Sequence, residues 1–336
     1  MIQPKHKQNG LSLIELMIAI GLSMILTLGV IQIFMSSKQT SRVQDSLARL
    51  QENARFALDL LAHDIRMAGQ LGCNSNALVI NNSGVLREMG NGIFGYEYSN
   101  ALNVVLLDDN GGNPDASDVV AATDSLVVMH AAATSIAASS TNDTITAVNH
   151  GFVQGEPLII SDCDNADLFV AGAVANDTIT IGNGTFSKNH DIAKAQLSSL
   201  NYNAYYIRTN NGQRNLYRSY ANNNGNNVGI TTEPLLEGVE DFQILYGEDI
   251  NSDGNSIRYV DADTIGADMS KVVSVRIHLL LATLEDNLAS TNQQYWYLNC
   301  DADAPNTVAL CDAADDRRLY RNFTTTVQLR NQGIGI

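Results

Sequence analysis

The chain has 336 residues and a formal net charge of −16 at pH 7, with 20 basic side chains against 36 acidic ones. This length suffices for one large domain or two modest ones. Most of the acidic excess lies after residue 70, where 13 bases accompany 31 acids. The charge therefore argues against a nucleic-acid partner, because no basic patch is expected that could neutralise phosphates.

A continuous apolar segment begins at Leu11 and ends at Met35. A helix of this length spans roughly 37 Å, which exceeds the bilayer core of about 30 Å. The preceding ten residues carry Lys5 and Lys7 and no acid, and bases beside an apolar segment stay in the cytoplasm. We therefore expect one membrane helix, with everything after Met35 outside the inner membrane. A removable signal peptide is the alternative, but its apolar core is usually only about 7–15 residues long.

Glu15 is the only charged residue in this apolar segment. A bare carboxylate costs about 2.5 kcal/mol or more at the bilayer centre and somewhat less near the interface. An ordinary anchor has no reason to include one, so Glu15 is expected to have a partner. The alternative is a glutamate whose carboxylate reaches the interface.

The helical pattern continues beyond the apolar segment to about Leu71. Apolar residues recur there at steps of three and four, which predicts one apolar face on an amphipathic helix. They are Val43, Leu47, Leu50, Ala54, Leu58, Leu61, Ile65 and Ala68. Gly69 and Gly72 mark the expected end, since glycine is the usual residue after a helix. The two segments together predict one helix of about 60 residues.

After Cys73 the sequence changes to short β-branched segments between clusters of Gly, Asn and Asp, which predicts strands. These are Asn103–Leu107, Ser125–His130, Thr144–Val148, Pro157–Ser161, Thr178–Ile181, Asn203–Arg208, Arg214–Ser219, Val239–Tyr246, Lys271–Leu281 and Arg318–Arg330. The Asn-Gly step at 211–212 predicts a hairpin. We expect an α+β fold in which one face of an antiparallel sheet packs on the helix.

Four cysteines follow the membrane segment, at Cys73, Cys163, Cys300 and Cys311. An even number on the oxidising side of the membrane predicts two disulfides. Of the three pairings we favour Cys73–Cys163 with Cys300–Cys311, because the second pair would close a short polar loop.

Two further motifs point to ligands less strongly. Gly90–Gly95 fits G-x-G-x-x-G, but a dinucleotide site needs a strand before it and a helix after it, so a glycine-rich loop is expected.

Asp249, Asn251 and Asp253 form the D-x-N-x-D-G start of a calcium loop. The twelfth position is Val260 in place of glutamate. Either Asp261 or Asp263 could substitute for it in a structural calcium site, and a plain turn is the alternative.

No other cofactor or metal is expected, and no catalytic arrangement is visible. The six histidines are scattered, and neither G-x-S-x-G nor H-E-x-x-H occurs in the sequence. We therefore do not expect an enzyme.

The N-terminal stretch from Gly10 through Glu15 resembles the class III signal of type IV pilins and type II secretion pseudopilins. It combines a short basic leader, Gly10, a glutamate at the fifth residue after it and a long helix beyond the membrane segment. Further segments resemble the PilW-type minor pilins. They are Ala54–Gly69, Gly72-Cys73, Gly155–Cys163, Gly238–Gly247, Val272–Ile277 and Asn322–Arg330. The family fold is a long N-terminal helix on an antiparallel β-sheet head.

The resemblance implies that a prepilin peptidase cuts between Gly10 and Leu11 and methylates the new amino terminus. Leu11 stands where the family most often has phenylalanine. The chain then divides into a leader (1–10), a membrane or filament-core helix (11–35), an amphipathic helix (36–72) and an extracytoplasmic head (73–336). Glu15 would pair with the amine of Leu11 on a neighbouring subunit.

The function expected from the resemblance is that of a minor pilin that initiates or caps a type IV pilus, stored in the inner membrane before assembly. The implied partners are other minor and major pilins, the prepilin peptidase, the inner-membrane platform with its ATPase, a PilY-type tip adhesin, and membrane lipid. One alternative is a J-type pseudopilin of type II secretion. A surface enzyme held by an N-terminal anchor is a more remote one.

Overall fold

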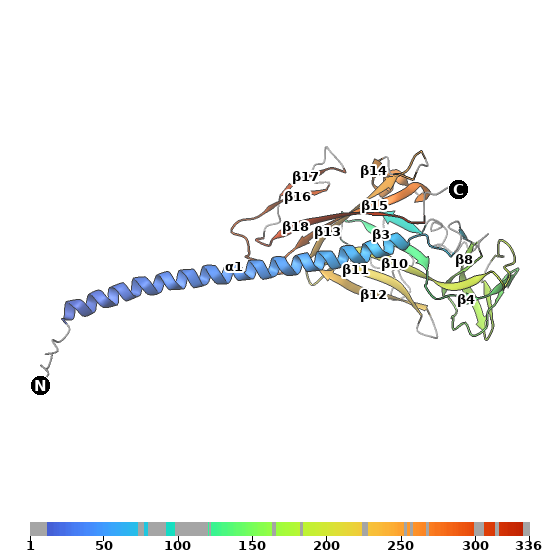
Figure 1. Ribbon diagram of the computed structural model, residues 1–336, viewed down its shortest axis with the longest axis horizontal. Coiled ribbons are helices and arrows are strands. Elements are labelled where there is room, and N and C mark those ends of the chain that lie inside the picture. The colour runs from blue at the N-terminus through green and yellow to red at the C-terminus, as the bar shows by residue number, and fades with distance from the viewer. Residues whose placement is uncertain are drawn as a thin grey trace, which may run out of the picture. The chain divides into compact units, whose positions relative to one another are not determined.

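The computed structural model describes residues 12–72, 77–79, 92–97, 120, 122–162, 166–181, 184–223, 228–251, 254–255, 258–266, 269–298, 306–312 and 316–331 (Figure 1). The chain separates into two compact units, Met1–Arg49 and Leu50–Ile336. In its described part, the first unit is helical apart from Ser12. The second unit contains the last turns of that helix and all of the described strands, and we call it the head.

Helix α1 extends from Leu13 to Met67 and has 55 residues, close to the predicted length. It ends where the sequence predicted, because Ala68 and Gly69 form a turn and Gly69 adopts a φ of 72° that favours glycine. Between residues 12 and 38 every described residue is exposed. Six residues of the predicted stripe lie in the head, from Leu50 onward, and five of them are buried while Leu58 is partly buried.

Twelve of the described strands form one sheet whose main path has the order β12-β11-β10-β7-β8-β9-β6-β5. Their bounds are β1 Ala77–Val79, β2 Ile93–Tyr96, β3 Ser125–Ala131, β4 Ile136–Ala137, β5 Ser139–Thr141, β6 Thr144–Thr146, β7 Pro157–Ser161, β8 Ala166–Ala175, β9 Thr178–Ile181, β10 Gln196–Asn210, β11 Gln213–Asn223 and β12 Val228–Glu237. The described pairings are antiparallel except that of β1 with β8.

Strand β10 organises this sheet because it has 15 residues and pairs along its length with four other strands. Its C-terminal half forms a hairpin with β11, in which Asn210 faces Gln213. Asn211 and Gly212 between them both have positive φ, of 51° and 78°, as the Asn-Gly signal predicted.

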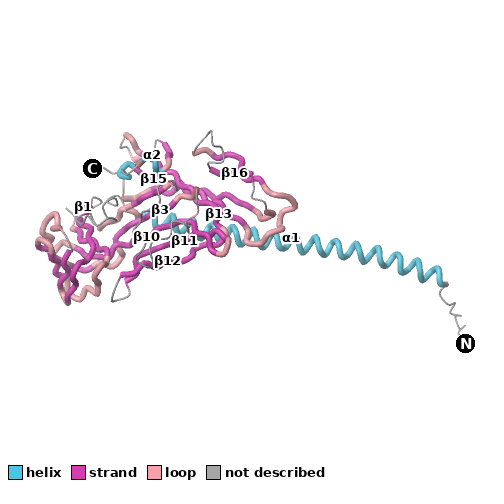
Figure 2. The backbone as a smooth tube through the Cα atoms, turned by 180° about the vertical axis from the view of Figure 1, so that it is seen from behind, coloured by secondary structure: helices cyan, strands magenta, loops and turns pink. Residues whose placement is uncertain are grey.

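A second sheet has the order β14-β13-β15-β18, with β13 Val239–Glu248, β14 Arg258–Val260, β15 Val272–Ala282 and β18 Tyr320–Gln328. Strands β16 Gln294–Leu298 and β17 Val308–Asp312 form a separate two-stranded sheet. The short helix α2 Ala262–Ile265 and a 3-10 turn at Met269–Lys271 precede β15. Figure 2 shows that strands and their loops make up most of the head.

The main core gathers side chains from α1 and from both large sheets. Leu61 and Ile65 of α1 share it with Tyr205 of β10 and with Phe242 and Ile277 of the second sheet, all at 1% exposure or less. The polypeptide passes from one sheet to the other at Gly238, where φ is 75° and a Cβ would lie 2.6 Å from the Ala282 oxygen. Glycine is therefore required at this crossing.

Most sequence-predicted strands are confirmed, and Val275, Ile277, Leu279 and Leu281 of β15 enter the main core. The prediction at Thr144–Val148 is too long, since β6 ends at Thr146. The strands that the sequence did not predict are β1, β2, β4, β5, β8, β12, β14, β16 and β17. The predicted strand Asn103–Leu107 lies outside the described residues. The α+β pilin-like fold class is confirmed.

Candidate assembly site

Glu15 lies in the first turn of α1 and is exposed, as are the apolar residues around it. An acid in this position also interacts favourably with the partly positive N-terminus of a helix. Within α1, one 18-residue stretch has a mean hydropathy of 2.3 and none of it is buried in the protein, so the helix is long and apolar enough to cross a membrane. Gly10 and Leu11, the predicted processing residues, lie outside the described part of the chain.

The other end of α1 is fixed to the sheet by Asp64, a buried acid that sequence periodicity did not single out. Its carboxylate accepts hydrogen bonds from the Tyr205 hydroxyl and, at 2.7 Å, from Asn203 Nδ2, both on β10. The His63 ring lies 3.1 Å from the same carboxylate. Burial and the adjacent Asp64 charge raise the pKa of Tyr205 above its ordinary value, so the hydroxyl stays protonated and donates.

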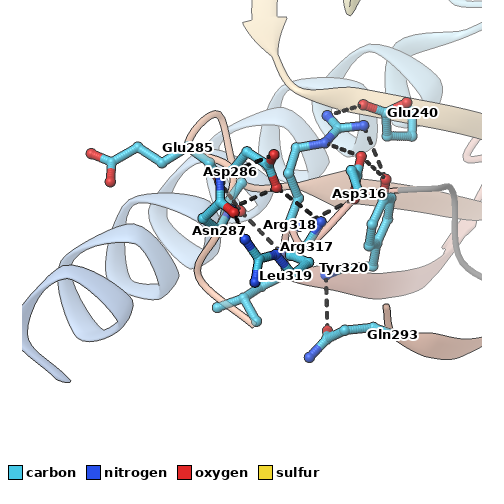
Figure 3. A network of polar contacts seen from close by, with 11 residues as sticks. Glu240, Glu285, Asp286, Asn287, Gln293, Asp316, Arg317, Arg318, Leu319 and Tyr320 are labelled. Atoms are coloured by element: carbon cyan, nitrogen blue, oxygen red, sulfur yellow. Dashed lines mark hydrogen bonds and ion pairs between the residues drawn. The ribbon is translucent and has the colours of Figure 1, made fainter. Parts of the chain in front are cut away.

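A second polar network joins the loops on either side of the β16–β17 sheet (Figure 3). Arg318 donates to Asp316 and to Glu240, both at 2.6 Å, and to the Tyr320 hydroxyl at 2.9 Å. The Arg317 backbone donates to Asp286 at 2.8 Å. These contacts connect the start of β13 with the segment before β18 and hold this margin of the head together.

Asp241, next to Glu240, is partly buried and has a perturbed pKa. Burial raises the pKa of its carboxyl group to about 6, although the Gln243 amide and the Phe242 backbone donate to it and act in the opposite direction.

Asp124, which is buried, and Glu97, which is partly buried, are two further acids that interact with each other. Burial raises the pKa of both carboxyl groups, and the neighbouring Glu97 charge raises the pKa of Asp124 further. The Ile244 backbone donates to Asp124 at 2.7 Å and the Ala262 backbone donates to Glu97 at 3.1 Å. Both acids therefore serve as acceptors for backbone groups of the head.

The described residues of the glycine-rich motif, 92–95, have a role in packing. Gly92 precedes strand β2, where a Cβ would lie 2.0 Å from the Gly69 nitrogen, and a Cβ on Gly95 would lie 1.9 Å from the Tyr246 hydroxyl. Ile93–Tyr96 is a strand, so no helix begins where a dinucleotide-binding motif requires one. The glycines therefore allow the end of α1 and strand β13 to approach this segment closely.

The calcium motif is only partly described. Asp249 is buried, and its carboxylate accepts a hydrogen bond from the Gly254 backbone at 2.6 Å, as in a turn. Asn251 is exposed, and Asp253 lies outside the described residues. Asp261 is used as the N-cap of α2, accepting from the Thr264 backbone at 2.7 Å. Among the described residues, no group of three His, Cys, Asp or Glu is placed to hold a metal ion.

Three of the cysteines, Cys73, Cys163 and Cys300, lie outside the described residues. Cys311 is buried in strand β17, 6% exposed. Leu310 and Val308 belong to that strand, so the segment before Cys311 is not wholly the polar loop that the sequence suggested. The two disulfide pairings remain predictions.

Of the histidines in the described part of the chain, His190 is the most buried, and its contacts are structural. Both ring nitrogens of His190 contact carboxylates, Asp162 at 3.1 Å and Asp167 at 2.9 Å, and Asp162 also pairs with Lys188 at 3.0 Å. The Ser187 hydroxyl also donates to Asp167, at 2.9 Å. Since both nitrogens of the His190 ring are engaged by acids, the described contacts form a buried polar network that holds this part of the head together.

Two known protein families match separate segments of this chain. Residues 204–331 match the family described as Type IV Pilus-assembly protein W. Residues 5–31 match the prokaryotic N-terminal methylation motif. These are the features of a PilW-family class III prepilin. No curated protein and no solved structure matches the chain significantly.

One match lies on the exposed apolar part of α1, and the other lies in the head. The methylation motif includes Glu15 and the exposed apolar turns of α1. The PilW region begins within β10, at the residue before the tyrosine that holds Asp64, and ends after β18. They support a role as a type IV pilus minor pilin, in a family of pilus-assembly proteins that are typically structural. The apolar helix also fits a pilin anchored in the inner membrane.

Replacing Asp64 with alanine tests its anchoring role. The change leaves the buried Tyr205 hydroxyl and the partly buried Asn203 amide without their acceptor, so we expect a loss of about 2–4 kcal/mol in the free energy of unfolding. Asp59→Ala is the matched control, since its ion pair with Arg55 is exposed and worth about 1 kcal/mol or less. Urea unfolding of the detergent-purified chain measures both, and equal losses would contradict the assignment.

Replacing Asp241 with asparagine tests the effect of its raised pKa. Because the folded chain holds this proton more tightly than the unfolded chain, whose pKa is near 3.8, the stabilisation is complete below pH 3.8 and is lost as the pH rises through about 6. The amide of the Asp241→Asn variant does not ionise, so wild type should lose on the order of 1–3 kcal/mol relative to the variant between pH 4 and pH 6. Unfolding curves across that range measure the difference, and parallel profiles would refute it.

Proposed function

We propose that this prepilin helps to initiate type IV pilus assembly and occupies a position at or near the pilus tip, where it contributes to twitching motility and adhesion. The observation that supports this most is the combination of a methylation motif with a large second unit, Leu50–Ile336, which contains the last turns of α1 and all of the described strands. A head of this size would crowd a helically packed shaft, which favours a small copy number at one end.

Assembly would proceed from the membrane. The prepilin peptidase removes residues 1–10, and the methylated amine of Leu11 becomes the new N-terminus. The exposed apolar turns of α1 then move from lipid into a bundle of equivalent helices of other pilins, which buries the same surface in protein. The inner-membrane platform and its ATPase drive this transfer, and a PilY-type adhesin is a partner at the tip.

Within that bundle, Glu15 pairs with the Leu11 amine of the adjoining subunit. Breaking a buried ion pair by removing one partner costs about 3–5 kcal/mol, enough to determine whether and in which register a subunit enters. The alternative role is that of a J-type pseudopilin in type II secretion. A deletion strain that loses twitching but still secretes protein distinguishes the pilus role from it.

We expect Glu15→Ala to abolish incorporation of the protein into sheared pili in a strain lacking the native copy, with no change in its amount in the membrane fraction. Glu52→Ala is the matched control, because it removes an exposed acid from the same helix without touching the apolar turns. Immunogold labelling of the control pili also tests position. Gold along the shaft would contradict the tip location, and normal incorporation of Glu15→Ala would contradict the pairing.

A further inference from the structure

A cleft beside the C-terminal end of α1 has no part in the assembly steps described above. Its volume is about 680 Å³, within the range of roughly 300–1,000 Å³ that small-molecule sites occupy. Its walls come from the last turns of α1 and the residues after them, the end of β3 with the following loop, the end of β7, and the start of β10 with the residue before it. All of the described lining residues follow Leu50, so the cleft belongs to the head alone.

The lining of this cleft is polar and contains no acid among its described residues. It includes three serines, three side-chain amides, two histidines and one lysine, Lys194. A wall without acids is unusual in a chain that has 36 acidic side chains against 20 basic ones. Lys194 is exposed, so its ammonium group can attract a negative charge in the cleft. The lining therefore suits a polar ligand that carries a negative group.

Two buried serines contribute hydroxyls to this lining. Ser161 and Ser198 are each 5% exposed, and within the described part of the chain neither hydroxyl has a hydrogen-bond partner. Gly72 makes room for one of them, because a Cβ at this position would lie 2.0 Å from Ser161 Oγ. Since buried hydroxyls are rarely left without a partner, we expect both to bond to water in the cleft or to a ligand that displaces it.

Neighbouring groups determine how two further side chains can bond to a ligand. The Nδ1 of His130 lies 3.0 Å from the Ala131 oxygen, so Nδ1 donates and Nε2 of the neutral ring is an acceptor. The Gln196 oxygen accepts from the Ser135 hydroxyl at 3.0 Å, which leaves the Gln196 amide nitrogen as a donor. A ligand hydroxyl can donate to the first group and accept from the second. The oxygens of a simple anion such as sulfate can only accept.

We propose that this cleft binds a saccharide that carries a carboxylate, such as a uronic acid. Lys194 pairs with the carboxylate, while Gln196, His130 and the two serines exchange hydrogen bonds with the sugar hydroxyls. The apolar remainder of the lining, Met67 and the alanines at 131–133, suits the C–H face of a sugar ring. The inference names a ligand for the adhesion included in the proposed function, and it rests on that function for its biological use.

The test measures binding of glucuronate, galacturonate and N-acetylneuraminate, with glucose and inorganic phosphate as comparison ligands. The full chain is kept in a detergent without a sugar headgroup, and saturation-transfer NMR titrations give the dissociation constants. Lys194→Gln removes the charge, and its matched control is Lys271→Gln, an exposed lysine of the head outside the cleft lining. Ser161→Ala removes one hydroxyl. Its control is Ser125→Ala, a buried serine outside the lining whose hydroxyl also has no partner in the described chain.

At least one of the three acidic sugars should bind saturably and more tightly than glucose. Lys194→Gln should weaken its binding roughly tenfold or more and leave glucose binding unchanged, because only the acidic sugar loses a charged hydrogen bond. Ser161→Ala should weaken binding of the acidic sugar about fivefold, as expected for one neutral hydrogen bond. Both control variants should bind as the wild type does.

The proposal would be overturned if none of the three acidic sugars bound saturably. Phosphate binding without binding of these sugars would assign the cleft to simple anions, and equal weakening by Lys271→Gln and Lys194→Gln would indicate general charge attraction. Either result also contradicts the proposal. Equal urea midpoints for all variants exclude a folding defect as the cause.

The binding measurement involves no filament, so its failure leaves the pilin assignment and the Glu15 pairing standing. Conversely, normal pilus incorporation of Glu15→Ala would contradict the assembly role without affecting saccharide binding by the head.

Discussion

The structure depends on one constraint: a single helix must be apolar and exposed at one end and buried in a β-sheet core at the other. From Leu50 onward α1 supplies part of the core that both large sheets share. Asp64 adds a directional contact, because its buried carboxylate accepts from two side chains of β10, the longest strand. Hydrophobic burial alone would tolerate rotation or sliding of the helix, whereas these hydrogen bonds require one rotation and one depth.

The exposed N-terminal turns of α1, unlike the turns in the head, have no core of their own chain to pack against in the described residues. In the described chain the segment up to Met35 buries no apolar side chain, so it needs lipid or other helices around it. A prepilin meets that need twice, first with the membrane and then with the filament. In the proposed assembly, Glu15 carries an uncompensated charge in the lipid and pairs with a methylated amine in the filament. That difference would give the transfer from membrane to filament a direction.

The sequence predicted the elements whose signals are local. The end of α1 near Gly69, the Asn211-Gly212 hairpin and the strand β15 each depend on residues close in the chain. Asp64 could not be identified as an anchor, because on the helix it resembles the exposed Asp59, and its partners are almost 140 residues away. The β16–β17 hairpin was missed because its aspartate-rich connection resembles a loop. Glu15 could be selected as a candidate from the sequence because a charge in an apolar segment is recognised without tertiary information, and its role stays a prediction.

The central claim is that α1 is an assembly helix released by prepilin processing, and not a permanent anchor. Intact-mass spectrometry of the protein purified from the membrane of its native host, followed by sequencing of the N-terminal peptide, tests this most directly. The account predicts a mature chain that begins at Leu11 and carries one methyl group on its amine. A chain that retains residues 1–10, or one cleaved after Met35, would contradict it.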